Sequence, residues 1–113
     1  NITKIYSKML FEYCKNHKNE LKYPFHIILE EAHRYVQNDS DVEVLGYNIF
    51  ERITKEGRKY GVLLTLISQR PSELSETSLS QCANFLIFKM LHPMDVEYIK
   101  RMIPNITNNI AII

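Results

Sequence analysis

The sequence lacks the glycine-rich loop, G-x-x-x-x-G-K-S/T, with which many enzymes cradle the phosphates of a nucleotide. It has only three glycines in 113 residues, so that phosphate cradle is not in this chain. The chain alone is therefore not expected to bind ATP tightly.

Cysteines and long apolar runs are also scarce. Cys14 and Cys82 lie far apart and show neither metal-binding nor redox spacing, which favours free buried thiols in a reducing compartment. No apolar run approaches the roughly 18 residues that span a bilayer, and the mixed start N-I-T-K-I-Y-S-K is not a signal peptide. We therefore expect a cytoplasmic protein without a membrane partner. The start without Met and the apolar end I-A-I-I are typical of an excised piece of a longer protein.

The charge balance is nearly neutral. A net charge of +1 gives no strong attraction to nucleic acid or to an acidic membrane, although it says little about local patches. The apolar fraction of 45% is that of an ordinary globular protein, and the length fits about one domain. We expect a single unit over residues 1–113.

Hydrophobic periodicity predicts alternating helices and strands. In the first helix, the apolar residues Ile2, Ile5, Met9, Leu10 and Tyr13 recur at helical spacing. The predicted elements are a helix over 2–15, a strand over 25–30, a loop or short helix over 32–36, a helix over 42–59, a strand over 62–68, a short helix near 79, a strand over 84–90 and a helix over 93–103. This alternation predicts an α/β fold with a mostly parallel sheet flanked by helices.

Turn and capping residues refine these boundaries. The polar cluster Asn38 to Asp41 is typical of a turn that caps a following helix, which Gly57 or Gly61 could terminate. Another strand could begin at Ile110.

The stretch F-H-I-I-L-E-E-A-H, residues 25–33, is the most informative part of the chain. A run that is apolar on both faces indicates a buried strand of a parallel sheet, and it ends in Glu30 and Glu31. Ligands of open α/β sheets bind at the carboxyl ends of strands. Because consecutive side chains of an extended chain point in opposite directions, one acid can face a metal and the other a water or substrate. The alternative is a strand that simply ends in solvent.

A different metal chemistry is disfavoured. Glu30-x-x-His33 matches the spacing of carboxylate-bridged di-metal bundles, but that motif needs a helix and a second copy. The β-branched run opposes a helix, and no second copy occurs. The histidines His17, His26, His33 and His92 form no visible ligand set, so a structural role is expected for each.

Gln69 follows the second predicted strand, at the edge where the two acids are expected. Glutamine orients the attacking water in other phosphoryl-transfer enzymes, whereas a lone Gln after a strand is usually a solvated loop residue. Arg70 could reach a phosphate or pair with Glu73.

A basic cluster, Lys55, Arg58 and Lys59, lies near the end of the helix over 42–59, with Arg52 one or two turns earlier. A guanidinium can stabilise charge on a transferring phosphoryl group and can come from a neighbouring subunit. The alternative is a solvated helix end, where cations are favoured by the helix dipole.

Three segments resemble one family. H-I-I-L-E-E-A-H-R-Y resembles the Walker B segment of the HerA/FtsK superfamily of P-loop ATPases, especially its HerA branch. I-T-K-E-G-R-K-Y-G-V-L-L-T-L-I-S-Q-R-P-S-E-L resembles the segment that follows, in which G-R-K-Y-G with S-Q-R-P-S is specific. C-A-N-F-L-I-F-K-M and H-P-M-D-V-E-Y-I-K-R-M-I-P resemble the next strand and helix.

This resemblance implies the C-terminal part of a RecA-like ATPase domain without its Walker A half. The parent would be an ATP-driven DNA translocase or helicase, usually a homo-hexameric ring and often beside a nuclease. Glu30 would hold Mg²⁺, directly or through water, and Glu31 would be the catalytic base. Gln69 would contact the γ-phosphate of ATP, and Arg58 would act across a subunit boundary, although Arg52 and Arg70 stay candidates for that role. The isolated chain would be inactive.

Two other functions stay open at this point. A non-catalytic α/β interaction module could have kept the scaffold and lost the nucleotide. A type IV secretion or conjugation ATPase would share the superfamily architecture but move a different substrate.

Overall fold

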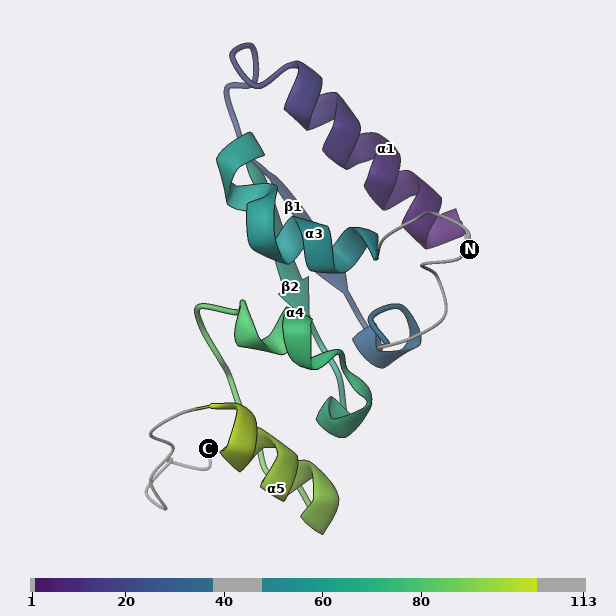
Figure 1. Ribbon diagram of the computed structural model, residues 1–113, viewed down its shortest axis with the longest axis vertical. Helices are drawn as coiled ribbons and strands as arrows, with labels where there is room; N and C mark the ends of the chain where they lie inside the picture. The colour runs from purple at the N-terminus through teal and green to yellow at the C-terminus, as the bar shows by residue number, and fades with distance from the viewer. Residues whose placement is uncertain (1, 38–47, 104–113) are drawn as a thin grey trace.

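The computed structural model describes residues 2–37 and 48–103 (Figure 1). Its α-helices are α1 (Ile2–Asn16), α3 (Ile49–Glu56), α4 (Glu76–Ser80) and α5 (Pro93–Met102). Its strands are β1 (Phe25–Leu29) and β2 (Val62–Leu66). Three short 3₁₀ segments also lie in these described residues, namely η1 (Ala32–Arg34), η2 (Gly57–Tyr60) and η3 (Pro71–Glu73). None of the helices in the described residues is both long and apolar enough to cross a membrane.

The two strands form a parallel sheet. Phe25 pairs with Val62 and Leu29 pairs with Leu66, with no slip between them. The connection between the strands includes α3, which packs against β2, and α1 packs against α3 (Figure 1). This mixed α/β arrangement confirms the predicted fold class and is consistent with part of a RecA-like fold.

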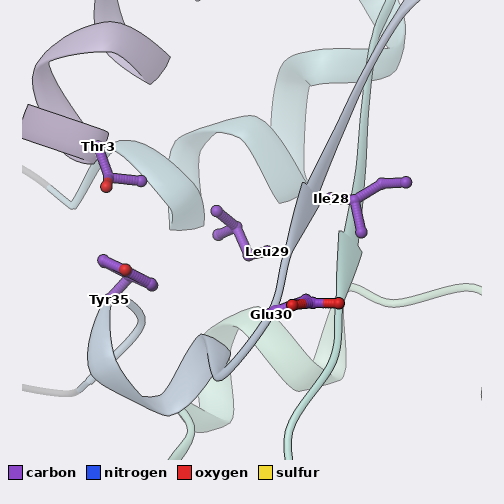
Figure 2. A pocket seen from close by; sticks show the side chains of 5 residues that line it. All are labelled: Thr3, Ile28, Leu29, Glu30 and Tyr35. Carbon is purple, nitrogen blue, oxygen red and sulfur yellow. The ribbon is translucent and has the colours of Figure 1, made fainter.

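The two faces of the sheet differ in burial. Leu29 and Val62 are buried on the helix side, whereas Ile28 and Leu63 are exposed on the other. Figure 2 shows Leu29 on one side of β1, with Ile28 and Glu30 on the opposite side. The side-chain alternation of a strand therefore sends Glu30 away from the helices.

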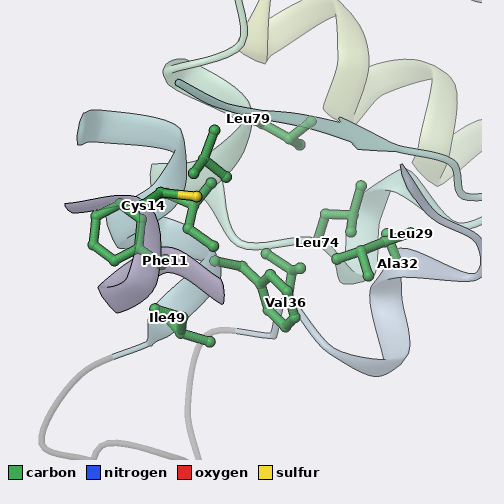
Figure 3. Close-up of a cluster of buried hydrophobic side chains, with 11 residues drawn as sticks. Phe11, Cys14, Leu29, Ala32, Val36, Ile49, Leu74 and Leu79 are labelled. Carbon is green, nitrogen blue, oxygen red and sulfur yellow. The ribbon is translucent and has the colours of Figure 1, made fainter. Parts of the chain in front are cut away.

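The core lies between the helices and the helix side of the sheet (Figure 3). Each large apolar side chain buried there stabilises the fold by roughly 1.5–3 kcal/mol. Its buried members are Phe11, Cys14, Leu29, Ala32, Val36, Ile49, Phe50, Ile53, Val62, Leu74 and Leu79.

Helix α1 turns an unexpected face to the core. The apolar residues Ile2 and Met9, whose spacing predicts the helix, are 72% and 63% exposed. Its buried residues are Lys4, Ser7, Phe11 and Cys14. Burial lowers the pKa of the Lys4 ammonium, because the charged form is the one that loses solvation. The helix is confirmed, but most of its apolar stripe points outward.

Helix α3 starts at a well-formed cap. The side chain of Asn48 accepts hydrogen bonds from the N–H groups of Phe50, at 3.0 Å, and Glu51, at 3.4 Å. The α-helix ends at Glu56, and η2 continues to Tyr60. The predicted residues 42–47 of this helix, its capping turn at 38–41 and the strand from Ile110 lie outside the described residues.

One predicted strand is wrong. Residues 84–90 form no strand, and Leu86 and Phe88 are 90% and 70% exposed. A strand needs a neighbour that completes its ladder of backbone hydrogen bonds, and within 2–37 and 48–103 the sheet contains only β1 and β2. The segment is apolar enough for a strand but pairs with no described one.

Helix α5 holds the chain that follows β2. The carboxylate of the buried Asp95 accepts the N–H of Ser72 at 3.1 Å. The hydroxyl of Tyr98 donates to the carbonyl oxygen of Leu74 at 2.9 Å. These two bonds fix η3 and the residues after it, only a few positions beyond the carboxyl end of the sheet.

Candidate functional site

The carboxyl end of β1 carries two exposed acids. Leu29 is buried, and Glu30 and Glu31 follow it directly. Glu31 has φ 50° and ψ 45°, and it is the one non-glycine residue with positive φ in the part of the chain that the structure describes. A left-handed residue of this kind costs on the order of 1–3 kcal/mol and is often found at functional sites. The turn at Glu31 leads the chain into η1.

Backbone hydrogen bonds join the ends of the two strands. The N–H of Ala32 donates to the carbonyl oxygen of Ile67 at 2.9 Å. The N–H of Ile67 donates to the carbonyl oxygen of Leu29, also at 2.9 Å. Because the strands are parallel, Gln69 follows β2 at the same edge at which Glu31 follows β1. The side chain of Gln69 is exposed there.

His33 lies between the two strand ends. Its Nε2 is 3.5 Å from Oε2 of Glu31, and its Nδ1 is 3.1 Å from Oγ of Ser68. The same Ser68 hydroxyl oxygen accepts the N–H of Arg70 at 3.0 Å. His33 is 8% exposed. The sequence assigned His33 a structural role only, and its contact with Ser68, 35 residues away, had no sequence signal.

Arg70 has a partner within its own turn. Its guanidinium lies 3.0 Å from Oε1 of Glu73, and both side chains are well exposed. Of the two roles expected for Arg70, the structure contains the pairing with Glu73. An exposed pair of this kind contributes about 0–1 kcal/mol, so a stronger anion could displace the carboxylate.

Arg58 lies at the other edge of the sheet. It belongs to η2, which precedes β2, and the N–H of Phe25 donates to the carbonyl oxygen of Gly61 at this amino edge, at 2.8 Å. A five-residue strand is about 13 Å long from end to end. The exposed Arg58 is therefore separated by the length of β2 from the edge that carries Glu31.

Arg52 is part of the scaffold. Its guanidinium lies 3.7 Å from a carboxylate oxygen of Glu12 and 3.6 Å from one of Glu56. It also lies over the Phe11 ring, 5.3 Å from the centroid. These contacts tie α3 to α1. The other cations of the basic cluster, Lys55 and Lys59, are exposed.

The exposed acids suit a magnesium ion that takes only one or two ligands from the protein and the others from a nucleotide and from water. Mg²⁺ is usually bound by one or two carboxylates, by substrate phosphates and by waters. Glu30 offers one exposed carboxylate on the open side of β1 (Figure 2). Residues 2–37 and 48–103 contain no group of three His, Cys, Asp or Glu side chains arranged around a common metal position. A shallow hollow of about 490 Å³ beside the end of β1 is lined by Thr3, Ile28, Leu29, Glu30 and Tyr35.

The structure argues against the di-metal alternative. Residues 25–29 are a strand and Ala32–Arg34 is a 3₁₀ segment, so Glu30 and His33 do not share a helical face. Two other histidines have structural partners, because His26 lies 2.7 Å from the Thr65 hydroxyl and His17 lies 2.9 Å from a backbone oxygen.

Comparison with protein-family models gives no match. Curated relatives are nonetheless similar over most of the chain. The DNA double-strand break repair helicase HerA of Saccharolobus solfataricus is 40% identical over 98 residues, which are 86% of this chain and 19% of that protein. HerA of Pyrococcus furiosus is 40% identical over 79 residues, which are 70% of this chain and 14% of that protein. A probable helicase of Methanocaldococcus jannaschii is 37% identical over 88 residues, with 78% and 17% covered.

The chain thus spans less than a fifth of the length of these relatives. These relatives nevertheless point to the same family, because several HerA helicases match at about the same identity and over most of this chain. The chain is therefore HerA-like, and it corresponds in sequence to a segment of the HerA helicases.

Proposed function

We propose that this chain is the C-terminal part of a RecA-like ATPase domain in a DNA motor of the HerA type. The observation that carries the proposal is the pair of backbone bonds between the strand ends, which brings Glu30, Glu31 and Gln69 to one edge of a parallel sheet. Ligands of α/β sheets bind at this edge. The similarity to proteins named as DNA repair helicases supports the same conclusion.

Each residue at this edge has a role in ATP hydrolysis under the proposal. Glu30 contributes a carboxylate to Mg²⁺, directly or through water, and the ion would neutralise charge on the phosphates of ATP. Glu31 accepts a hydrogen bond from the attacking water and draws its proton away. Gln69 donates its amide to the γ-phosphate. Arg70 is free to exchange its exposed partner Glu73 for a phosphate oxygen.

Arg58 is proposed to act on the nucleotide of a neighbouring subunit. Its place at the amino edge of β2 separates it from the Glu31 edge of its own chain. A closed ring brings different edges of adjacent subunits together. Arg52 is a poor candidate for this role, because two carboxylates and an aromatic ring already hold its guanidinium.

The parent protein is proposed to be a cytoplasmic homo-hexamer that moves along DNA, with a nuclease as partner. This chain has no glycine-rich phosphate loop of its own, so the isolated 113 residues should not hydrolyse ATP.

The full-length parent carrying Glu31→Gln tests the proposal. Loss of a general base lowers turnover by about 10²–10⁴-fold, while ATP binding should persist because the amide keeps the size of the carboxylate. Glu20→Gln, at an exposed loop residue, serves as the matched control. Unchanged turnover in the Glu31 variant would remove Glu31 from catalysis. A parent that turns over no ATP at all would instead favour a non-catalytic interaction module.

A further inference from the structure

We propose that His33 is a positioning residue, which holds the Glu31 carboxylate and ties it to the turn that carries Gln69. The inference rests on the proposed role of Glu31 in ATP hydrolysis and adds a residue to that site. It starts from the contacts of one buried imidazole with groups from both strand ends.

The hydrogen-bond partners give these contacts a direction. The backbone N–H of Arg70 can only donate, so Oγ of Ser68 accepts it. The Ser68 hydroxyl proton is then available to Nδ1 of His33. A neutral imidazole that accepts at Nδ1 carries its proton on Nε2, and Nε2 faces Glu31. The result is a chain of contacts from the Arg70 amide to the Glu31 carboxylate.

The backbone leaves only the side chain of Glu31 to be positioned. The left-handed conformation of Glu31 and the bond from Ala32 to Ile67 fix where its Cα lies. The Glu31 side chain, however, is 48% exposed, whereas that of His33 is 10% exposed. A half-exposed glutamate samples several rotamers unless a fixed group holds it. Within the described residues, the buried His33 ring is a fixed group whose Nε2 lies 3.5 Å from that carboxylate, close enough to become a hydrogen bond after a small rotation of the Glu31 side chain.

The position of Ser68 explains why this contact would matter to turnover. Gln69 lies between Ser68, which contacts His33, and Arg70, whose N–H binds Ser68. A shift of this turn when Gln69 meets a phosphate would pass through Ser68 to His33 and then to Glu31. Outer-shell groups that orient a metal ligand typically change activity by about 10–100-fold when removed, and we expect an effect of the same order for a group that orients the Glu31 carboxylate.

A purely structural His33 is the competing explanation, and His26 supplies the matched control. His26 also joins β1 to β2 through a hydroxyl, because its Nε2 lies 2.7 Å from Oγ1 of Thr65. His26 lies within β1, several residues before Glu31. In the part of the chain that the structure describes, its hydrogen-bond partner is Thr65, which is not a residue of the candidate site. If joining the strands is all that matters, His26 and His33 variants should behave alike.

The test uses the full-length parent with ATP, and it measures kcat, KM and the melting temperature. His33→Ala should lower kcat by about 10–100-fold, with KM changed by less than about threefold. His33→Gln places an amide N–H near the former Nε2 and should recover much of kcat. His26→Ala should keep wild-type kcat. Ser68→Ala should give a smaller loss than His33→Ala, and it replaces that variant if His33→Ala does not fold.

The double variant with Glu31→Gln separates the possible failures. If His33 acts through Glu31, His33→Ala should lower kcat no further in the Glu31→Gln background. A full additional loss there, or wild-type kcat in His33→Ala alone, overturns the role of His33 while leaving the proposed function intact. If Glu31→Gln itself has wild-type turnover, Glu31 is removed from catalysis and this inference fails with it, whereas a parent that turns over no ATP at all contradicts the proposed function.

Discussion

Gly57 offers a sharp test of how the G-R-K-Y-G segment is packed. A Cβ atom at this position would lie 2.5 Å from the carbonyl oxygen of Val62 and 3.0 Å from Cγ2 of Ile53. The Val62 oxygen belongs to the first residue of β2, which is paired with Phe25 of β1. The clash is therefore with backbone that cannot move alone, and Gly57→Ala should force the start of β2 away from α3.

Two opposing terms set the size of the effect. Gly57 has φ −55° and ψ −42°, so alanine would gain up to about 1 kcal/mol in helical conformation. Overpacking of a tight contact typically costs about 1–3 kcal/mol. We expect the free energy of unfolding to fall by about 1–2 kcal/mol, since a clash with strand backbone lies in the upper part of that range. For about 100 residues, each kcal/mol lowers the melting temperature by about 4–8 °C.

Gly61 is the control, because its backbone conformation limits the choice of residue there and packing does not. Its φ of 73° is left-handed, but a Cβ there would meet only the Cα of Pro24, at 3.8 Å. Asparagine tolerates left-handed backbone better than alanine does. Thermal unfolding followed by circular dichroism should therefore rank Asn above Ala at Gly61 and Ala above Asn at Gly57. A Gly57→Ala variant as stable as wild type would refute the packing argument.

Two further predictions concern the subunit boundary and pH. If Arg58 acts across that boundary, Arg58→Ala and Glu31→Gln parents should each be nearly inactive. An equal mixture of the two should regain about a quarter of wild-type turnover, because one interface in four has both intact groups; no recovery would place Arg58 in its own site. Burial, reinforced by the charge of Glu76, raises the pKa of Tyr98. The folded state then keeps the phenol proton longer than the unfolded state, so the stabilisation is complete below about pH 10 and declines as pH rises further. Urea unfolding between pH 8 and 11 should show this decline in wild type and less of it in Tyr98→Phe.

The sequence predicted the elements whose signal is local. The apolar runs of β1 and β2 and the Pro93 start of α5 are local signals, and the structure has an element at each of them. Residues 84–90 have a comparable apolar run, but a strand also depends on a neighbour, which the run itself cannot supply. Helical periodicity likewise shows which residues of α1 share a side. It does not show that Phe11 faces the core while Met9 faces outward.

The candidate site also has features that the sequence predicted and features that it did not. Chain order and parallel pairing were enough to bring Glu31 and Gln69 to one edge, because the carboxyl ends of parallel strands coincide. The left-handed turn at Glu31 and the contact of His33 with Ser68 were not predictable. Both depend on side chains and backbone that meet only after the strands have paired.

Each residue of the E-E-A-H segment, residues 30–33, has a different structural role at the end of β1. Glu30 continues the alternation of β1 and points to the open side of the sheet (Figure 2). Glu31 makes the left-handed turn that leaves its carboxylate at the edge. Ala32 is fully buried while its N–H binds Ile67, so a larger side chain there would overpack the core. His33 places its Nε2 3.5 Å from a carboxylate oxygen of Glu31. Under the proposed function, these four features together hold the two carboxylates at the edge of the sheet where the nucleotide would bind.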